Sequence, residues 1–319
     1  MQRLLPSVAP RAARCSPSDL LRLHDHCAGA KRLLVVTGAG VSTHSGIPDY
    51  RSPNGSYSRG HKPIQHAEFV KSEASRKRYW TRSFVGWQYF SRATPNAAHL
   101  ALADLEAHQF VDNLITQNVD GLHTQAGSQH VLDLHGRIDA VECLSCGDVS
   151  RRDVFQQRLA QANSAWAASL EPLLPTELRA DGDMELDAET TDFILPSCAR
   201  CGDGVLKPAV TFFGGSVPPS IVQSAADAVD RSDALLVLGS SLQVFSAFRL
   251  ARAASRAGKP IAIVSNGPTR ADELAALKLE ADVCDTVPRL LAKLLDVEHG
   301  PPDGATDVLE TAGRVVGSN

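Results

Sequence analysis

The 319-residue sequence lacks the features of a membrane or secretory protein. It has no apolar run near the roughly 20 residues that a membrane-spanning helix needs, and no secretory apolar segment is visible. It also lacks an excess of charge, because 32 Lys and Arg side chains nearly balance 36 Asp and Glu side chains. The net charge of −4 gives no reason to expect binding to nucleic acid or membrane. We expect a cytoplasmic protein, and a monomer.

The first 17 residues lack acidic side chains and contain three arginines and three prolines. The arginines resemble those of a transit peptide, which would place the protein in the mitochondrial matrix. The prolines work against the amphipathic helix that such a peptide needs, so a flexible tail is the preferred interpretation. We therefore predict flexible tails over 1–16 and 298–319 around a folded region over 17–297.

A glycine-rich turn follows the first strand-like run, but its third glycine is missing. The apolar run Leu33–Val36 leads directly into Gly38-Ala39-Gly40, and Val41 then begins a predicted helix. This order is typical of a dinucleotide-binding turn, in which free N–H groups at a helix start face a phosphate. Thr43 stands where the third glycine of the usual pattern would be, so an ordinary strand–helix turn is the alternative.

The rest of the chain alternates short apolar strands with helices, and several strands end in Gly, Ser or Asn. This pattern predicts an α/β protein with a doubly wound, Rossmann-like parallel sheet. Two interruptions predict a smaller lobe of helices and a zinc module. The large lobe is predicted over 17–50, 93–142 and 205–297, and the small lobe over 51–92 and 143–204. Among the local predictions are helices over 68–90 and 271–278, a strand over 281–284 and an exposed acidic segment over 181–192.

Four of the seven cysteines form two C-x-x-C pairs, Cys143/Cys146 and Cys198/Cys201. Each pair can supply two thiolates from one tight turn, and four thiolates suit a tetrahedral Zn²⁺. A Cys₄ site has no open coordination position, so we predict one structural zinc ion. The alternative is a pair of redox-active or unliganded dithiols.

These motifs together resemble the sirtuin family of NAD-dependent protein deacylases. The resemblance rests on GAGVSTHSGIPDYRS, TQNVDGLH, LHG, the two C-x-x-C pairs, GSSLQV and SNG, which occur in this order. PIQHAEFV and RYWTRSFVGWQYF are most similar to class II sirtuins, the group of the mitochondrial lipoamidase and ADP-ribosyltransferase. The Tyr and Arg that mark the desuccinylases are not evident, so acidic acyl groups are less expected.

The resemblance implies that NAD⁺ is consumed as a co-substrate, with an acyl-lysine protein or peptide as the other substrate. In the family, the acyl carbonyl oxygen displaces nicotinamide, and a base then activates a ribose hydroxyl. The residues implied as NAD contacts are Gly38, Ala39, Gly40, Ser42, Ile47, Pro48, Asp49, Tyr50, Arg51, Gln117, Asn118, Val119, Asp120, Gly239, Ser240, Ser241, Ser265, Asn266, Gly267 and Cys284.

His135 is the implied catalytic base, with Asn118 and Asp120 as catalytic partners in the nicotinamide pocket. An unperturbed imidazole is largely neutral at pH 7 and can accept a proton. The alternatives are a structural histidine at 135 and a solvated polar loop at 117–120. A neighbouring strand-like loop supplies the implied substrate contacts Val210, Phe212, Phe213 and Gly214.

This substrate loop departs from the family pattern KPDVVFFGE. The chain has KPAVTFFGG, with Ala209 and Gly215 where the family has acids. We expect the loss of these carboxylates to change peptide preference or loop order without removing the base.

Four functions are consistent with one or more of these motifs. A deacylase releases nicotinamide and O-acyl-ADP-ribose, and a variant of it prefers longer acyl or lipoyl groups. A mono-ADP-ribosyltransferase uses the same NAD site to modify a protein. The third function is that of a non-catalytic NAD- and zinc-binding regulator, and the fourth is that of a nicotinamide oxidoreductase, which would transfer hydride. The sequence favours the deacylase.

Overall fold

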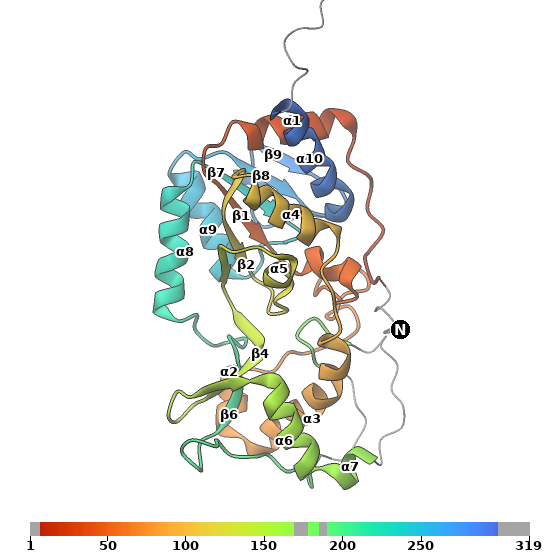
Figure 1. Ribbon diagram of the computed structural model, residues 1–319, viewed down its shortest axis with the longest axis vertical. Coiled ribbons are helices and arrows are strands. Elements are labelled where there is room, and N and C mark those ends of the chain that lie inside the picture. The colour runs from red at the N-terminus through yellow and green to blue at the C-terminus, as the bar shows by residue number, and fades with distance from the viewer. Residues whose placement is uncertain (1–6, 169–177, 185–189, 299–319) are drawn as a thin grey trace, which may run out of the picture.

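The computed structural model describes residues 7–168, 178–184 and 190–298. Figure 1 shows two lobes stacked along the long axis, with a broad sheet in the upper lobe and mostly helices in the lower lobe. In the described part of the chain, no helix combines the length and the apolar character needed to cross a membrane.

The large lobe is built on a six-stranded sheet in which all neighbouring strands are parallel. The strand order is β3-β2-β1-β7-β8-β9. The strands are β1 (Leu33–Thr37), β2 (Val111–Thr116), β3 (Val131–Asp133), β7 (Ala234–Leu238), β8 (Ile261–Val264) and β9 (Leu277–Leu279). The predicted doubly wound sheet is therefore confirmed. The order reverses between β1 and β7, and ligands of such sheets bind beyond the strand ends at this switch point.

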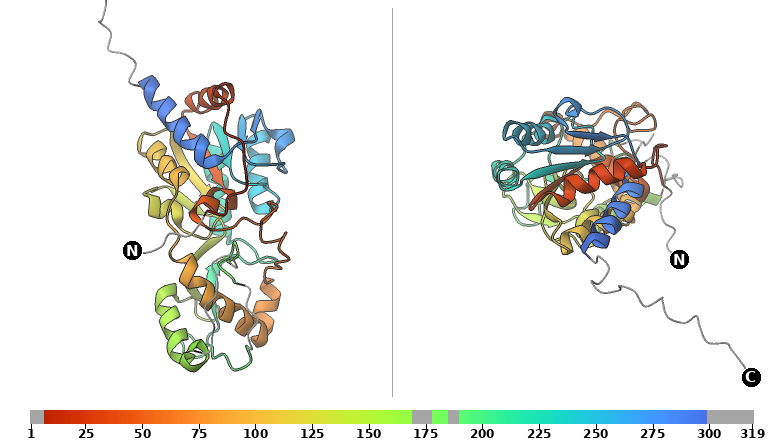
Figure 2. Two further views of the ribbon diagram at one scale, coloured as in Figure 1. Left: turned by 90° about the vertical axis from the view of Figure 1, so that its right-hand side faces the viewer. Right: turned by 90° about the horizontal axis from the view of Figure 1, so that it is seen from above.

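Helices cover both faces of this sheet, because β1 is apolar on both sides. Leu33 and Val35 join a core with α1 (Pro17–Ala28), α4 (Ala97–Ala107) and α10 (Val283–Glu298). Leu34 and Val36 join the opposite core, with α8 (Pro219–Arg231) and α9 (Phe245–Arg256). The view from above in Figure 2 shows the two helix layers with the sheet between them. A strand buried on both faces explains why its sequence is a continuous apolar run.

The helix predicted after β1 is present as a 3₁₀ helix, η1 (Ala39–Ser45). Two other local predictions near the sheet are wrong. The predicted helix over 271–278 is a short 3₁₀ turn, η3 (Asp272–Leu274), followed by strand β9. Leu277 and Leu279 are buried on either side of the half-exposed Lys278, which is the alternation of a strand pairing with β8. The predicted strand over 281–284 instead leads into α10.

The small lobe has an aromatic core. The predicted helix over 68–90 is two helices, α2 (His66–Lys71) and α3 (Glu73–Phe90). Ser72 separates them in an extended conformation, and its hydroxyl accepts a hydrogen bond from the Ser75 N–H. This is an N-cap, so the second helix begins afresh. Helices α6 (Arg152–Ala162) and α7 (Ser164–Ala168) also lie in this lobe, whereas α5 (Leu122–Ala126) lies against α4 of the large lobe.

A second, three-stranded antiparallel sheet joins the two predicted lobes. Its order is β5-β4-β6, with β4 at Gly136–Cys143, β5 at Val149–Arg151 and β6 at Leu206–Val210. Because β4 spans the predicted boundary at 142/143, this sheet takes residues from both predicted lobes. The boundaries themselves stay a prediction. Gly136 has φ +79°, and a Cβ there would meet the Ala209 carbonyl oxygen at 2.1 Å, so only glycine allows this strand pairing.

Two segments that the sequence predicts to be flexible or exposed are partly packed against the rest of the protein. Residues 7–16 belong to a predicted flexible tail, yet the Val8 N–H donates to the Thr43 carbonyl at 3.0 Å and Cys15 is buried. Residues 1–6 and 299–319 of the predicted tails lie outside the described residues. The acidic segment is predicted to be exposed, but Asp183 and Met184 are buried against α3. Residues 185–189 of that segment also lie outside the described residues.

Candidate active site

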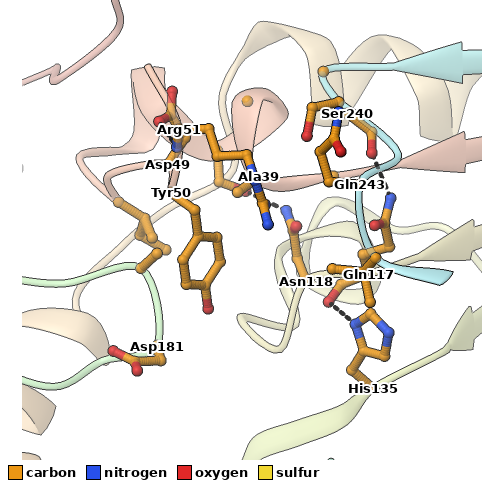
Figure 3. Close-up of a pocket in the computed structure, with 18 of the residues that line it drawn as sticks. Ala39, Asp49, Tyr50, Arg51, Gln117, Asn118, His135, Asp181, Ser240 and Gln243 are labelled. Carbon is orange, nitrogen blue, oxygen red and sulfur yellow. Dashed lines mark hydrogen bonds between the residues drawn. The ribbon is translucent and has the colours of Figure 1, made fainter. Parts of the chain in front are cut away.

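One cleft of about 1590 Å³ lies between the lobes, at the carboxyl ends of β1 and β7. It brings together nearly all the predicted functional residues. His135, Val210, Phe212, Phe213 and Gly214 line it, as do all the predicted NAD contacts except Pro48 and Cys284. Figure 3 shows Asp49, Tyr50 and Arg51 on one side of the pocket, opposite Gln117, Asn118 and His135.

The glycine turn after β1 packs closely against the turn that follows β7. The Gly40 N–H donates to the Gly239 carbonyl at 2.9 Å, and a Cβ on Gly40 would meet that oxygen at 2.8 Å. At Gly40 the loops after β1 and β7 therefore meet backbone to backbone, and a Cβ on Gly38 would meet the Ser240 side chain at 2.7 Å. These close approaches explain the two glycines, whereas Thr43 lies further on, inside η1.

The ring of His135 has a defined proton arrangement. Its Nδ1 lies 2.9 Å from the Gln117 carbonyl oxygen (Figure 3). Its Nε2 lies 2.8 Å from the Ser246 hydroxyl. A carbonyl oxygen can only accept, so Nδ1 carries the proton and Nε2 presents a lone pair. Burial lowers the pKa of His135 below its ordinary value, although the Gln117 hydrogen bond opposes that shift. The imidazole is thus neutral at pH 7, and Nε2 is its proton-accepting nitrogen, which accepts from the Ser246 hydroxyl in this structure.

Asn118 and Asp120 meet at the hydroxyl of Ser42. The Asn118 amide donates to Ser42 Oγ at 3.0 Å, and that hydroxyl donates to Asp120 Oδ2 at 2.7 Å. The other oxygen of Asp120 accepts from the Leu122 N–H at 3.0 Å. His99 lies behind Ser42, and burial lowers its pKa to about 3, so it stays neutral. The network holds a carboxylate and an amide in fixed positions beside the cleft.

Gln117 joins the loops that follow β1, β2 and β7. Its Nε2 donates to Ser240 Oγ at 2.7 Å and to the Thr37 carbonyl at 3.0 Å. Its own carbonyl accepts from His135, as described above. Gln117 therefore fixes the base relative to the switch point of the sheet.

The segment after η1 forms a compact turn on the facing wall. Asp49 Oδ1 accepts from the N–H groups of Arg51 and Ser52, at 3.1 and 2.9 Å. The Arg51 guanidinium lies 5.1 Å from the centre of the Tyr57 ring and remains exposed. Asp49 thus orders the loop, and Arg51 keeps donors available for an anion.

Three of the four residues predicted to contact the adenosine end of NAD⁺ line the cleft. Ser265, Asn266 and Gly267 line the cleft after β8. Cys284 does not line it, and its N–H donates to Asp282 Oδ1 at 2.7 Å, so that amide is already used. Asp282 and Val283 line the cleft in its place.

Backbone hydrogen bonds hold the predicted substrate loop. The Thr211 N–H donates to the His135 carbonyl at 2.8 Å, and the His66 N–H donates to the Phe213 carbonyl at 2.8 Å. The Gly215 N–H closes a turn onto the Phe212 carbonyl at 2.9 Å. The loop is thus tied to both flanking elements without carboxylates at 209 and 215.

The four paired cysteines converge as a zinc site requires. Their sulfur atoms all lie within 4.8 Å of one another, with Cys143–Cys201 at 3.7 Å and Cys146–Cys198 at 3.8 Å. Zn–S bonds of about 2.3 Å in a tetrahedron give sulfur separations of roughly 3.8 Å. Backbone N–H groups of Cys146 and Arg200 also approach Cys143 and Cys198 sulfur, at 3.5 and 3.4 Å. The donor set and its dimensions fit a closed structural Zn²⁺.

Asp181 and Ser246 are among the cleft residues that the sequence analysis did not predict. Asp181 reaches the cleft from the acidic segment, and its Oδ2 lies 3.1 Å from His61 Nε2. Ser246 lies in the first turn of α9, and its hydroxyl contacts His135 Nε2. Neither residue belongs to a motif, and only the folding of distant segments brings them here.

Comparisons with known proteins agree with this site. A model described as Sir2 family matches residues 38–246. The chain is 49% identical over 275 residues to the NAD-dependent protein deacylase Sirt4 of Drosophila melanogaster, covering 85% of this chain and 86% of that protein. It is 46% identical over 282 residues to the human mitochondrial NAD-dependent protein lipoamidase sirtuin-4, covering 88% of each.

A solved structure of Sir2 with p53 peptide and NAD⁺ has a similar fold, with a TM-score of 0.67 and 28% sequence identity. The alignment covers 85% of this chain and 97% of that one. The predicted resemblance to sirtuins, and to the lipoamidase group among them, is thereby confirmed. The chain belongs to the Sir2 family.

Proposed function

We propose that this sirtuin is an NAD-dependent protein-lysine deacylase in which His135 is the general base. The observation that carries the proposal is the His135 ring in the cleft lining, whose Nδ1–H is fixed by the Gln117 carbonyl, so that Nε2 is the acceptor, bonded here to the Ser246 hydroxyl that a substrate hydroxyl would replace. The relatives named as NAD-dependent deacylases, and the Sir2 structure with peptide and NAD⁺, support the reaction class.

In this proposal each wall of the cleft has one task. The co-substrate NAD⁺ supplies the ribose that accepts the acyl group. Asn118 and Asp120, oriented through Ser42, bind the nicotinamide end. Gly40, Gly239 and the loop after β8 face the phosphates and the adenosine. Arg51 donates hydrogen bonds to the pyrophosphate. The loop over 210–214 binds the peptide as an added strand, and His135 Nε2 takes a proton from a ribose hydroxyl.

The cysteine site has a structural task only. Cys143, Cys146, Cys198 and Cys201 would hold Zn²⁺, which here supplies cross-linking of two chain segments and no open coordination position.

The test is mass spectrometry of an acyl-lysine peptide panel incubated with NAD⁺. We expect nicotinamide and O-acyl-ADP-ribose from the wild type, and a loss of about 10²–10⁴-fold in turnover for His135→Tyr, the contribution of a general base. His130→Tyr is the matched control, because the His130 side chain is 68% exposed. Unchanged turnover in His135→Tyr would remove His135 from this role.

The pH dependence gives a second test. A base must be unprotonated, and the pKa of His135 lies below its ordinary value because the ring is buried. Activity should therefore persist as pH falls through about 6.5, the unperturbed histidine pKa, and decline only below it. The measurement is kcat/KM between pH 5 and 9. A decline that begins above pH 7 would contradict the neutral, buried base.

Longer acyl groups form a second candidate substrate class. Tyr50, Ile64, Tyr79 and Phe212 give the cleft a largely apolar wall beyond Asn118, which suits an aliphatic chain. The human and bovine relatives are named lipoamidases. A higher kcat/KM for lipoyl-lysine than for acetyl-lysine peptides in the same panel would establish the preference. ADP-ribosylation is distinguished by mass, because the modified protein gains ADP-ribose and no acyl acceptor product appears.

A mitochondrial location, the alternative to the cytoplasm, has support from the names of relatives. The human and bovine relatives are both named mitochondrial. Fractionation of cells that express the full chain tests it, and exclusive recovery in the cytosol would reject it.

A further inference from the structure

The segment 8–13, here called the strap, runs from the start of α1 down the side of the large lobe toward the cleft (Figure 1, dark red). It contains no predicted functional residue. Four of its residues, Ala9, Pro10, Arg11 and Ala12, nevertheless line the cleft together with His44, Asn266 and Asp282. The strap therefore lies at the end of the cleft where the loop after β8 is proposed to hold adenosine.

Hydrogen bonds tie the strap to three separate walls of this end. The Val8 N–H donates to the Thr43 carbonyl in η1 at 3.0 Å. The Asn266 Nδ2 donates to the Arg11 carbonyl at 3.1 Å, and the Asp282 N–H donates to the Ala13 carbonyl at 2.9 Å. These anchors belong to the glycine turn region, the loop after β8 and the approach to α10. The strap thus bridges the elements between which the adenosine would lie.

The contact with Asn266 also settles the orientation of its side-chain amide. An amide nitrogen donates and an amide oxygen accepts, so a hydrogen bond to the Arg11 carbonyl assigns Nδ2 to the strap. The amide oxygen is then the atom left for the hydroxyl groups of a ribose. The strap orients a predicted NAD contact as well as enclosing the site.

We propose that the strap is the outer wall of the adenosine subsite and retains the adenosine half of NAD⁺ and of its ADP-ribose products. The proposal rests on the NAD site described under the proposed function. Retention slows dissociation of any ligand that carries adenosine diphosphate. Free nicotinamide has no adenosine. Although Thr43 follows Ser42 in η1, none of the three anchoring hydrogen bonds uses a group of Ser42, Asn118 or Asp120, so nicotinamide binding should not depend on the strap.

The first test removes one anchor. Val8→Pro deletes the N–H that bonds to Thr43, and Val8→Ala is the matched control because it retains this N–H. Calorimetry with ADP-ribose, and stopped-flow measurement of its release, should show roughly threefold to tenfold weaker binding and faster release for Val8→Pro, the range expected for one net hydrogen bond. Inhibition by nicotinamide and the KM for the acyl peptide should stay within about twofold of the wild type.

The second test removes residues 8–12, which are all of the strap except Ala13. Deletion of residues 1–12 should weaken ADP-ribose binding more than Val8→Pro does, again without weakening nicotinamide binding. The zinc content and melting temperature of each variant show whether it is folded, and either folded variant suffices for the test. The proposal is overturned if the folded variants bind ADP-ribose as tightly as the wild type, or if nicotinamide binding falls by the same factor.

These measurements separate the strap from the proposed activity. ADP-ribose binding needs no acyl peptide, so a wild-type protein that binds ADP-ribose without deacylating any peptide would refute the deacylase and leave the strap testable. A wild-type protein that does not bind ADP-ribose would refute the NAD site and the strap with it.

Discussion

The two lobes reach stability by different means. The large lobe sandwiches a six-stranded sheet between two helix layers, and its central strands β1 and β7 are buried along their whole length. The small lobe shares the three-stranded sheet with the large lobe and has one aromatic core and several buried polar groups, including Arg152 and Asp183. A small core of this kind supplies limited stability, which is why small modules are so often cross-linked by a metal. The comparison predicts that the lobes can be destabilised separately.

The strongest prediction concerns zinc. Cys143→Ala removes one of four ligands, and a structural Zn²⁺ contributes on the order of 10 kcal/mol to the folding of a small metal-bound module. We expect the metal content to fall from one ion per chain to none and the small lobe to unfold. All three tryptophans (Trp80, Trp87 and Trp166) lie in α3 and α7, so tryptophan fluorescence reports this lobe selectively.

Far-ultraviolet circular dichroism should meanwhile retain the signal of the large lobe. Cys27→Ala is the matched control, since Cys27 is buried in the large-lobe core outside the cluster and its loss should leave zinc in place. A zinc-free Cys143→Ala protein with native fluorescence and full activity would contradict the structural role.

The large lobe should respond differently to a core substitution. Leu236 lies fully buried at the centre of β7, and Leu236→Ala should lower the free energy of unfolding by about 2–5 kcal/mol. Both cores of the large lobe pack on this sheet, so the circular dichroism signal should be lost at a lower temperature than in the wild type. Leu21→Ala, at a side chain 48% exposed on α1, should change stability little. Selective loss of the tryptophan signal in Leu236→Ala would contradict this prediction.

A buried carboxyl should make the small lobe pH-sensitive. Burial, and then the nearby Asp181 carboxylate, raise the pKa of Asp183 above its ordinary value. Above about pH 4 the unfolded state releases a proton that the folded state still binds at Asp183. Asp183 therefore lowers the free energy of unfolding as pH rises above about 4, until the folded state also releases the proton. Asp183→Asn removes the cost and should raise stability at pH 8 by about 1–2 kcal/mol, with little change at pH 4.

Thermal melts monitored by tryptophan fluorescence at the two pH values measure this difference. Asp203→Asn is the matched control, because Asp203 is exposed in the same lobe. Stabilisation of equal size at both pH values would exclude titration of Asp183 as the cause.

The smallest expected effect concerns the junction of the lobes. The Ser246 hydroxyl donates to His135 Nε2 and thus favours the neutral ring. Ser246→Ala should shift the acid limb of kcat/KM to higher pH by about 0.4–1 unit, because a net hydrogen bond contributes roughly 0.5–1.5 kcal/mol. Ser255→Ala on the same helix is the control. A limb that stays in place would mean that this hydroxyl does not influence the base.

The same contrast between the lobes explains which features the sequence predicts. Continuous apolar runs such as Leu33–Val36 indicate a parallel sheet, and ordered motifs locate most of the cleft, because both signals are local. The sequence does not predict strand β9, since Leu277–Leu279 becomes a strand only by pairing with β8. The sequence predicts the strap to be part of a flexible tail, because the residues that bind it, Thr43, Asn266 and Asp282, are distant along the chain. Asp181 and Ser246 reach the cleft through the same long-range packing.

His135 is held both through its ring and through its backbone carbonyl. Its ring is held by Gln117 and Ser246 of the large lobe, whereas its backbone carbonyl accepts the Thr211 N–H of the substrate loop. Gly136, the next residue, begins β4 and pairs with Val210 of β6. The loop proposed to bind the peptide is therefore joined by main-chain pairing to the strand that begins beside His135. This pairing uses no side-chain atom, so the register between a peptide on the loop and His135 is set by the backbone alone.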